Sequence, residues 1–277
     1  MPVWIVCGIL LLVFLLYLFL IACARPKKEW TAPFQNLQCA HRGLYEKDQS
    51  IPENTLEAFA RAAEHGYGVE LDVQLSKDGE VIVFHDDTVD RETAYTGRVD
   101  AYTLSELQAM SLFGTEGREK RIPLFTEVMA VLDQKSPTIV ELKSTENYVE
   151  LCEKTLAILR TLRGPYCVES FDPRIVRWFR LHAPDIMRGQ LTEAYAGWRK
   201  GMSASKAFGL SHLWTNLVTR PHFIAYGSKT RPLAWFLAKI TGAFLVYWTE
   251  READDHARLK QQYDCLIFEH FRPDTHY

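Results

Sequence analysis

The chain has 277 residues, of which 47% are hydrophobic and 24% charged, and its formal net charge is −3. This composition supplies enough apolar material for one large domain, and the lack of a basic field argues against nucleic-acid binding. Six cysteines without CxxC spacing indicate neither a disulfide framework nor a zinc site. No feature of the sequence indicates a protein partner.

The first predicted element is a transmembrane helix. Residues 3–24 carry no charge and consist mainly of Leu, Ile, Val and Phe. A helix of that length spans roughly 30 Å, the thickness of the hydrocarbon core of a membrane. The basic run from Arg25 to Lys28 follows at once, and the positive-inside rule places it in the cytoplasm. We therefore expect a single-pass protein of the cell membrane with a cytoplasmic domain.

A lipoprotein is the alternative for this segment. The sequence from Leu20 to Cys23 resembles a bacterial lipobox, which would leave an acylated Cys23 outside the cytoplasm. No basic residue precedes the apolar run, which favours the uncleaved anchor. The predicted organisation is an anchor with its basic flank at 1–28, a linker at 29–37 and one domain at 38–277.

Strand-like and helix-like segments alternate through the domain. The predicted strands are Gln38–His41, Gly68–Val73, Val81–His85, Thr138–Lys143, Tyr166–Phe171, Ile186–Leu191, Leu213–Leu217, Phe244–Thr249 and Cys265–Glu269. The predicted helices are Thr55–His65, Leu124–Gln134, Tyr148–Arg163, Pro173–His182, Pro232–Thr241 and Arg251–Tyr263. This alternation predicts an α/β fold with parallel strands, either a (β/α)8 TIM barrel or an open doubly wound sheet.

Several local signals refine the fold prediction. No GxGxxG turn follows the first strand, which weakens the open-sheet alternative. Nine strand candidates exceed the eight places of a barrel, so one is expected in a hairpin around Lys77-Asp78-Gly79. Thr55 and the pair Asp172-Pro173 are expected to begin helices.

Acidic side chains interrupt two of the strands. Glu70 and Asp72 are two residues apart, so they face the same side of a strand, and Glu141 and Lys143 share a face in the same way. Three carboxylates that meet in a barrel mouth would repel one another. A divalent cation, Mg²⁺ or Ca²⁺, relieves that repulsion with all-oxygen ligands. The alternative is a structural network in which Lys143 and Arg42 pair with the acids.

Two histidines end strand-like runs, His41 in His-Arg-Gly and His85 in Phe-His-Asp. Either could exchange a proton near pH 7. A single histidine in such a position is more often a structural residue, but two of them beside the acid pair favour an active site.

Together these motifs resemble the glycerophosphodiester phosphodiesterase family. The resemblance is carried by His41-Arg42-Gly43, Pro52-Glu53-Asn54-Thr55, ELDV at 70–73, Lys77-Asp78-Gly79, the FHD motif with Arg91, VELK at 140–143, Glu169-Ser170-Phe171-Asp172 and Trp248-Thr249. It covers essentially the whole domain.

The resemblance implies a TIM barrel that hydrolyses glycerophosphodiesters to sn-glycerol 3-phosphate and an alcohol. It implies that His41 and His85 are the acid–base pair. The implied metal ligands are Glu70, Asp72 and Glu141, and the implied substrate-binding residues are Arg42, Lys143 and Trp248. One histidine would deprotonate the nucleophile, plausibly the adjacent glycerol hydroxyl, and the other would protonate the leaving alkoxide.

Some features of the sequence leave alternatives open. The last strand, with Glu269-His270, departs from the family pattern. A lysophospholipase D or phospholipase that acts on membrane lipid, and a barrel that only binds ligands, are the other functions considered. The segment from His222 to Thr241 fits a packed barrel helix, with contact to lipid head groups as its alternative. Asn216 and Arg220 are further candidates for the barrel mouth.

Overall fold

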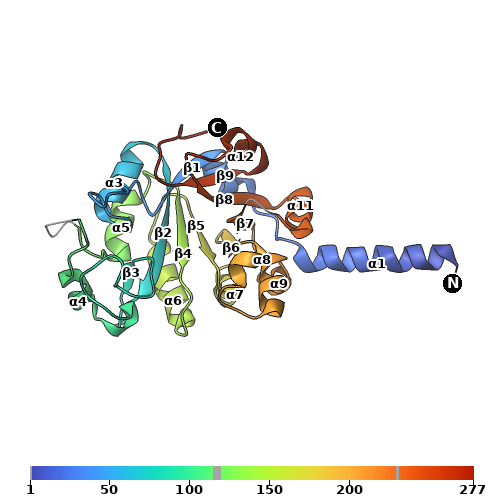
Figure 1. Ribbon diagram of the computed structural model, residues 1–277, viewed down its shortest axis with the longest axis horizontal. Helices are drawn as coiled ribbons and strands as arrows, with labels where there is room; N and C mark the ends of the chain where they lie inside the picture. Colours follow the sequence, from blue (N-terminus) through green and yellow to red (C-terminus); the bar gives the residue numbers. More distant parts are fainter. Residues whose placement is uncertain (1, 115–119, 229–230) are drawn as a thin grey trace.

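The computed structural model describes residues 2–114, 120–228 and 231–277. Its first helix, α1 (Val3–Ile21), projects from the rest of the protein (Figure 1). Among the described residues it is the one helix that is long and apolar enough to cross a membrane, with a mean hydropathy of 3.0. A signal sequence would meet the same criteria of length and composition.

Eight parallel strands form a closed barrel. They are β1 (Leu37–His41), β2 (Gly68–Leu75), β4 (Thr138–Leu142), β5 (Tyr166–Ser170), β6 (Arg188–Thr192), β7 (Phe223–Tyr226), β8 (Phe244–Glu250) and β9 (Cys265–Phe268). Each pairs with the next, and β1 closes the ring by pairing with both β2 and β9. The predicted TIM barrel is therefore confirmed.

Helices cover the outside of the barrel (Figure 1). The longer ones are α3 (Leu56–Glu64), α5 (Phe125–Leu132), α6 (Tyr148–Leu159), α7 (Pro173–His182), α9 (Ala204–Ser211), α11 (Leu233–Ile240) and α12 (His256–Gln262). The short ones are α2 (Lys28–Thr31), α4 (Leu104–Ala109), α8 (Tyr195–Trp198), α10 (Asn216–Thr219) and the 3-10 turns η1 (Ala32–Phe34) and η2 (Val99–Ala101). Both predicted helix starts are confirmed, because the side chains of Thr55 and Asp172 accept backbone N–H groups of α3 and α7.

The ninth strand lies outside the barrel, as the strand count predicted. It is β3 (Val81–Val83), which pairs antiparallel with the outer half of β2. The turn between them includes Gly79 at φ +78°, a backbone conformation that glycine adopts without strain. The chain then makes an excursion with its own small apolar cluster before it reaches α5.

The prediction for the seventh strand is wrong. Residues 213–215 lie in a turn, residues 216 and 217 begin α10, and the strand is instead Phe223–Tyr226. In a strand, Leu213, Thr215 and Leu217 would face the same side of the sheet. Instead, Leu213 is buried in a cluster with residues of α1 and α11, whereas Leu217 is exposed. The apolar character of this segment therefore serves helix packing and a surface, not a sheet.

Apolar side chains close the bottom of the barrel, where the strands begin. Phe34 of η1 packs there among side chains such as Met187, Phe223 and Phe244. Polar side chains occupy the other half of the barrel, toward the carboxyl ends of the strands. This division leaves one mouth for chemistry, as is general for the fold.

Candidate active site

Strand register aligns the acids of the barrel. Asp72 of β2 pairs in register with Glu141 of β4, which pairs in turn with Glu169 of β5. His41 of β1 is in register with Glu70 of β2. Register partners on neighbouring strands point to the same side of a sheet, so these side chains all enter the barrel together.

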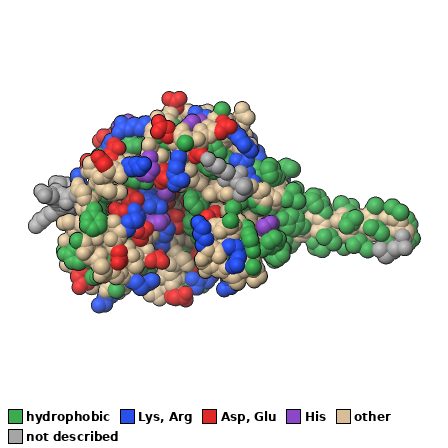
Figure 2. Space-filling view, in the orientation of Figure 1, with side chains coloured by type: hydrophobic (Ala, Val, Ile, Leu, Met, Phe, Trp, Pro, Cys, Tyr) green, Lys and Arg blue, Asp and Glu red, His purple; other side chains and the backbone are tan. Residues whose placement is uncertain are grey.

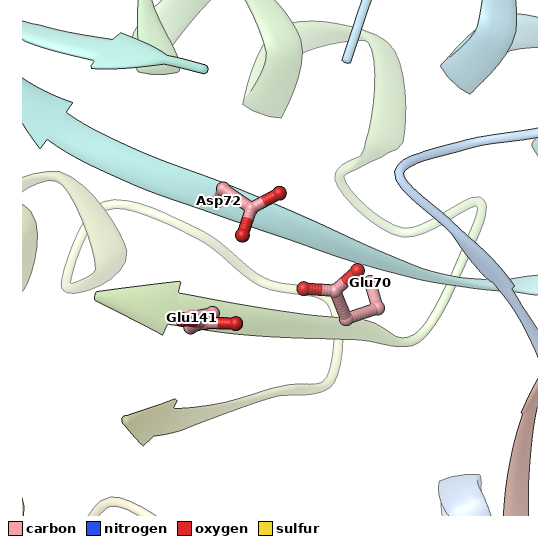
Figure 3. Close-up of side chains that lie close together, drawn as sticks. All are labelled: Glu70, Asp72 and Glu141. Atoms are coloured by element: carbon pink, nitrogen blue, oxygen red, sulfur yellow. The ribbon is translucent and has the colours of Figure 1, made fainter. Parts of the chain in front are cut away.

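Glu70, Asp72 and Glu141 converge in the structure (Figure 3). Each offers a carboxylate oxygen, and the three oxygens lie within 4.8 Å of one another. All three residues are buried. The structure thus brings together the three residues that the strand periodicity placed on one face.

The electrostatics of this cluster call for positive charge. Burial raises the pKa of Glu70, and the neighbouring charges of Asp72 and Glu141 raise it further. Burial also raises the pKa of Glu141, only partly offset by Lys143. Asp72 differs, because Lys143, His85 and Arg42 outweigh its burial and hold its pKa below the usual range. A divalent cation with a preference for oxygen ligands fits this donor set.

A fourth carboxylate, that of Glu169, lies beside the cluster and was not among the predicted site residues. It is buried, and its Oε2 atom has no hydrogen-bond partner among the described residues. Burial and then the charges of Glu141 and Asp72 raise its pKa well above the usual value. The period-two spacing along β5, which places Cys167 and Glu169 on the same face, was the signal that could have identified it.

Two cationic side chains reach the acids. The Nζ atom of Lys143 lies 2.9 Å from Oε1 of Glu141 and 3.4 Å from Oδ1 of Asp72. The Nε atom of Arg42 lies 3.6 Å from Oδ2 of Asp72. The Nη1 atom of Arg42 donates to Oε1 of Glu53 at 2.7 Å. The proposed structural pairing of these cations with acids is present, but two cations do not neutralise four buried carboxylates.

Asn54 and Arg91 support this arrangement from the loop regions. Asn54 donates from Nδ2 to Oδ2 of Asp72 at 2.9 Å, which fixes the carboxylate that is shared with Lys143. Arg91 donates from Nη2 to Oε1 of Glu53 at 2.8 Å and from Nε to Oδ2 of Asp86 at 2.6 Å. The loops after β1 and β3 are thereby tied to each other at the barrel mouth.

Each candidate histidine is oriented by a carboxylate on its Nδ1 atom. His41 Nδ1 lies 2.8 Å from Oε2 of Glu269, and His85 Nδ1 lies 2.6 Å from Oδ1 of Asp86. A carboxylate accepts a hydrogen bond from Nδ1–H and so leaves Nε2 as the atom that can exchange a proton with a ligand. His41 Nε2 lies 3.9 Å from Oε2 of Glu70, at the edge of the acidic cluster.

Burial lowers the pKa of His41, and the hydrogen bond to Glu269 opposes that effect without reversing it. Glu269 was noted in the sequence only as a departure from a family pattern, and its contact with His41 was not predicted. It lies just beyond β9, which is next to β1 in the closed barrel. No local sequence signal identifies that neighbour, because the contact depends on closure of the ring.

Trp248 of β8 lies against Phe171 edge to face, with 5.3 Å between ring centroids. Its Nε1–H is buried without an acceptor among the described residues. Gly227, which follows β7, makes room for the ring, because a methyl group there would overlap the indole.

Two further candidates for the mouth lie elsewhere. Asn216 donates to the carbonyl oxygen of Ile21, and Arg220 donates to those of Phe19 and Ala22. Both residues therefore hold the end of α1. His270 is at the surface beside Tyr45, in edge-to-face contact with it.

Comparisons with known proteins agree with this geometry. The profile of the Glycerophosphoryl diester phosphodiesterase family matches residues 41–272. A glycerophosphodiester phosphodiesterase of Caldanaerobacter subterraneus is 32% identical over 244 residues, which cover 84% of this chain and 93% of the relative.

Solved structures share the fold. A phosphodiesterase of Oleispira antarctica in complex with the product sn-glycerol-3-phosphate superposes with a TM-score of 0.70 at 24% identity, over 86% of this chain and 94% of that one. A glycerophosphodiester phosphodiesterase of Thermotoga maritima superposes with a TM-score of 0.64 at 23% identity, over 84% and 93%. The chain belongs to the glycerophosphoryl diester phosphodiesterase family.

Proposed function

We propose that this protein hydrolyses glycerophosphodiesters to sn-glycerol 3-phosphate and an alcohol. The observation that carries the proposal is the meeting, in one barrel mouth, of a buried carboxylate cluster and two histidines whose Nδ1 atoms are both held by carboxylates. The names of the relatives support the same activity, since a bacterial relative that aligns with 84% of this chain is a glycerophosphodiester phosphodiesterase.

Glu70, Asp72 and Glu141 would hold one divalent cation, Mg²⁺ or Ca²⁺. The fit rests on three oxygen donors that lie within 4.8 Å of one another. It rests also on the raised pKa values of Glu70 and Glu141, which a bound cation would lower. When bound, the ion supplies positive charge against the phosphate oxygens.

Arg42 and Lys143 would bind the phosphate. Both are largely enclosed cations at the edge of the carboxylate cluster, with side chains 14% exposed. Burial alone would lower the pKa of Lys143, but Glu141 and Asp72 raise it above the usual value, so the ammonium stays charged. Charge that accumulates on the equatorial phosphate oxygens would be neutralised by these side chains.

The two histidines would move the protons. Nε2 of one takes a proton from the glycerol hydroxyl next to the phosphate, whose oxygen then attacks phosphorus. Nε2 of the other donates a proton to the departing alkoxide, which leaves as the free alcohol. Water then opens the resulting cyclic phosphate with the two roles reversed. Trp248 would pack against the glycerol portion.

The proposed organisation is an anchor at residues 1–28, a linker at 29–37 and a catalytic domain at 38–277. Residues 3–24 would span the cell membrane, with the domain in the cytoplasm, and acylation at Cys23 is the alternative. Ala24 is tied to the domain by donation from its N–H to the carbonyl of Pro221 at 2.9 Å. A C-terminal reporter that is active only in the cytoplasm tests the orientation, because a silent reporter contradicts it.

A lysophospholipase D activity is the second candidate. It is favoured by the aromatic side chains near the mouth, where Phe171 contacts both Trp198 and Trp248 and could meet an acyl chain. Hydrolysis of lysophosphatidylcholine beside glycerophosphocholine distinguishes the two substrates.

The main test is release of glycerol 3-phosphate from a panel of diesters, with and without EDTA. We expect release that EDTA abolishes and that Mg²⁺ or Ca²⁺ restores. Absence of release from every diester in the presence of both ions would contradict the proposal and favour a barrel that only binds.

A further inference from the structure

Hydrophobic side chains gather on the domain where α1 leaves it, as Figure 2 shows. Outside α1, twelve large hydrophobic residues are exposed among those that the structure describes, and seven of them lie between residues 208 and 240. We call these seven the α9–α11 surface: Phe208, Trp214, Leu217, Val218, Leu233, Phe236 and Ile240. Scattered exposed apolar residues are ordinary, but a concentration of them on one side marks an interaction surface.

Helix α11 has two apolar faces. Ala234, Trp235 and Ala238 are buried against the barrel. Leu233, Phe236 and Ile240 recur at spacings of three and four residues on the other face and are 64%, 47% and 80% exposed. A surface helix of a protein in water normally presents a polar outer face, so α11 is suited to a second apolar environment.

This surface is continuous with α1. Arg220 donates from Nη1 to the carbonyl oxygens of Phe19 at 2.6 Å and Ala22 at 2.9 Å, and Asn216 donates to that of Ile21 at 2.8 Å. These donors occupy carbonyl groups that the end of a helix leaves without partners. Helix α1 also packs against α10 and α11. The exposed apolar residues therefore surround the point where α1 enters the domain.

The charges fit the same environment. Helices α9, α10 and α11 contain two charged residues, Lys206 and Lys239, and no acidic residue. The basic run from Arg25 to Lys28 begins four residues after the end of α1. Lysine and arginine at the edge of an apolar surface match anionic lipid head groups, and an exposed Trp such as Trp214 suits the interfacial layer.

We propose that the α9–α11 surface lies in the interfacial layer of the bilayer that α1 spans, so that the domain is held by two attachments. The proposal rests on the membrane anchor of the proposed function. Burial in the head-group and upper acyl region removes the seven side chains from water, as in monotopic membrane proteins. Two attachments fix the tilt of the barrel, which a single helix followed by a free linker would not do.

The test is depth-dependent quenching in the full-length protein, reconstituted in nanodiscs with an anionic lipid fraction. In a Cys7→Ser background, Val218→Cys and Ile240→Cys each carry an environment-sensitive fluorophore, and nitroxide lipids serve as quenchers. Val149→Cys on α6 is the matched control, since Val149 and Val218 are 41% and 45% exposed. The Cys7→Ser protein without an added cysteine retains Cys23 and, after the same labelling reaction, provides the blank. The protein with native Cys7, labelled at that residue, reports on α1 itself.

We expect quenching at positions 218 and 240 to exceed that at 149 by at least about twofold. Quenching at both positions no greater than at 149, with Cys7 quenched, would overturn the surface and leave the anchor intact. An unquenched Cys7 would overturn the anchor and this inference with it. Hydrolysis of soluble glycerophosphocholine by each labelled variant verifies the fold and tests the catalytic proposal separately.

Discussion

The Nδ1 atom of His41, at the end of β1, lies 2.8 Å from Oε2 of Glu269, just beyond β9. The other carboxylate oxygen of Glu269 accepts a hydrogen bond from Nε of Arg251 at 2.7 Å. Burial raises the pKa of Glu269, but His41 and Arg251 outweigh it and hold the pKa well below the usual range. Glu269 is therefore an ionised acceptor that fixes the ring of His41.

Replacement of that acceptor should impair catalysis through His41. We expect Glu269→Gln to lower kcat about 10- to 100-fold, since the ring loses its orienting carboxylate. Glu269 raises the pKa of His41, so the limb of the pH–rate profile that His41 controls should move to lower pH. Arg251→Ala, which leaves the contact with His41 in place, should have a much smaller effect. An unchanged profile in Glu269→Gln would contradict the assigned role.

The histidines themselves should be indispensable. His41→Asn and His85→Asn should each lower kcat about 10²–10⁴-fold, because each removes the proton exchange at one Nε2 atom. His65→Asn, at the exposed end of α3, should retain full activity. Full activity in either site variant, measured as release of glycerol 3-phosphate, would refute the two-histidine mechanism.

Substitution of the proposed metal ligands should have opposite effects on stability and activity. Glu70→Gln removes one charge from a cluster in which burial and repulsion raise the pKa of Glu70, so in EDTA the variant should unfold at a temperature no lower than the native protein. Its activity should be lost. Mg²⁺ or Ca²⁺ should raise the melting temperature of the native protein and not that of the variant.

Glu141→Gln tests the same site from β4, outside the motifs of β1 and β2. It too should abolish the metal-dependent rise in melting temperature. A rise equal to that of the native protein in both variants would place the cation elsewhere.

The position of Trp248 should depend on Gly227. Gly227→Ala forces the indole aside, and we expect KM for glycerophosphodiesters to rise about tenfold with a smaller change in kcat. Gly201→Ala is the matched control, because open space surrounds a methyl group at that position. Unchanged kinetics in Gly227→Ala would show that Trp248 does not contact the substrate.

His222 should make the fold sensitive to mild acid. It is buried beside Arg188, and burial followed by that charge lowers its pKa to about 3. The unfolded chain binds a proton below a pKa of about 6.5, whereas the folded protein does not, so stability falls as pH decreases below that value. From pH 7 to 5 this group should cost about 1–2 kcal/mol.

His222→Asn should remove that share of the pH dependence. Urea unfolding of both proteins at pH 7 and pH 5 measures it as the difference between the two pH effects. Equal losses of unfolding free energy in the native protein and the variant would show that His222 does not titrate on unfolding.

Local patterns were sufficient to predict most of the barrel and the acidic cluster. Period-two alternation in β2 and β4 placed Glu70, Asp72 and Glu141 on inward faces, and parallel pairing then brings them together. The cap at Asp172 and the hairpin at Gly79 are likewise properties of a few adjacent residues. Such features depend little on distant parts of the chain.

Features that depend on distant contacts were missed. The apolar run at Leu213 was interpreted as a strand, but its partners are α1 and α11. Asn216 and Arg220 were candidates for the barrel mouth, but they bind the end of α1, which is distant in the sequence. Glu169 could have been found from strand periodicity. Glu269 could not, because its neighbour His41 is known only when the order of strands around the ring is known.

The pairing of β1 with β9 also has a consequence for folding kinetics. A refolding intermediate in which β2, β4 and β5 have assembled would already contain all the carboxylates of the cluster, whereas His41 gains its orienting partner only when the first and last strands of the ring meet. Cation binding and turnover should consequently recover at different times during refolding. The onset of turnover would then report the moment at which the ring closes.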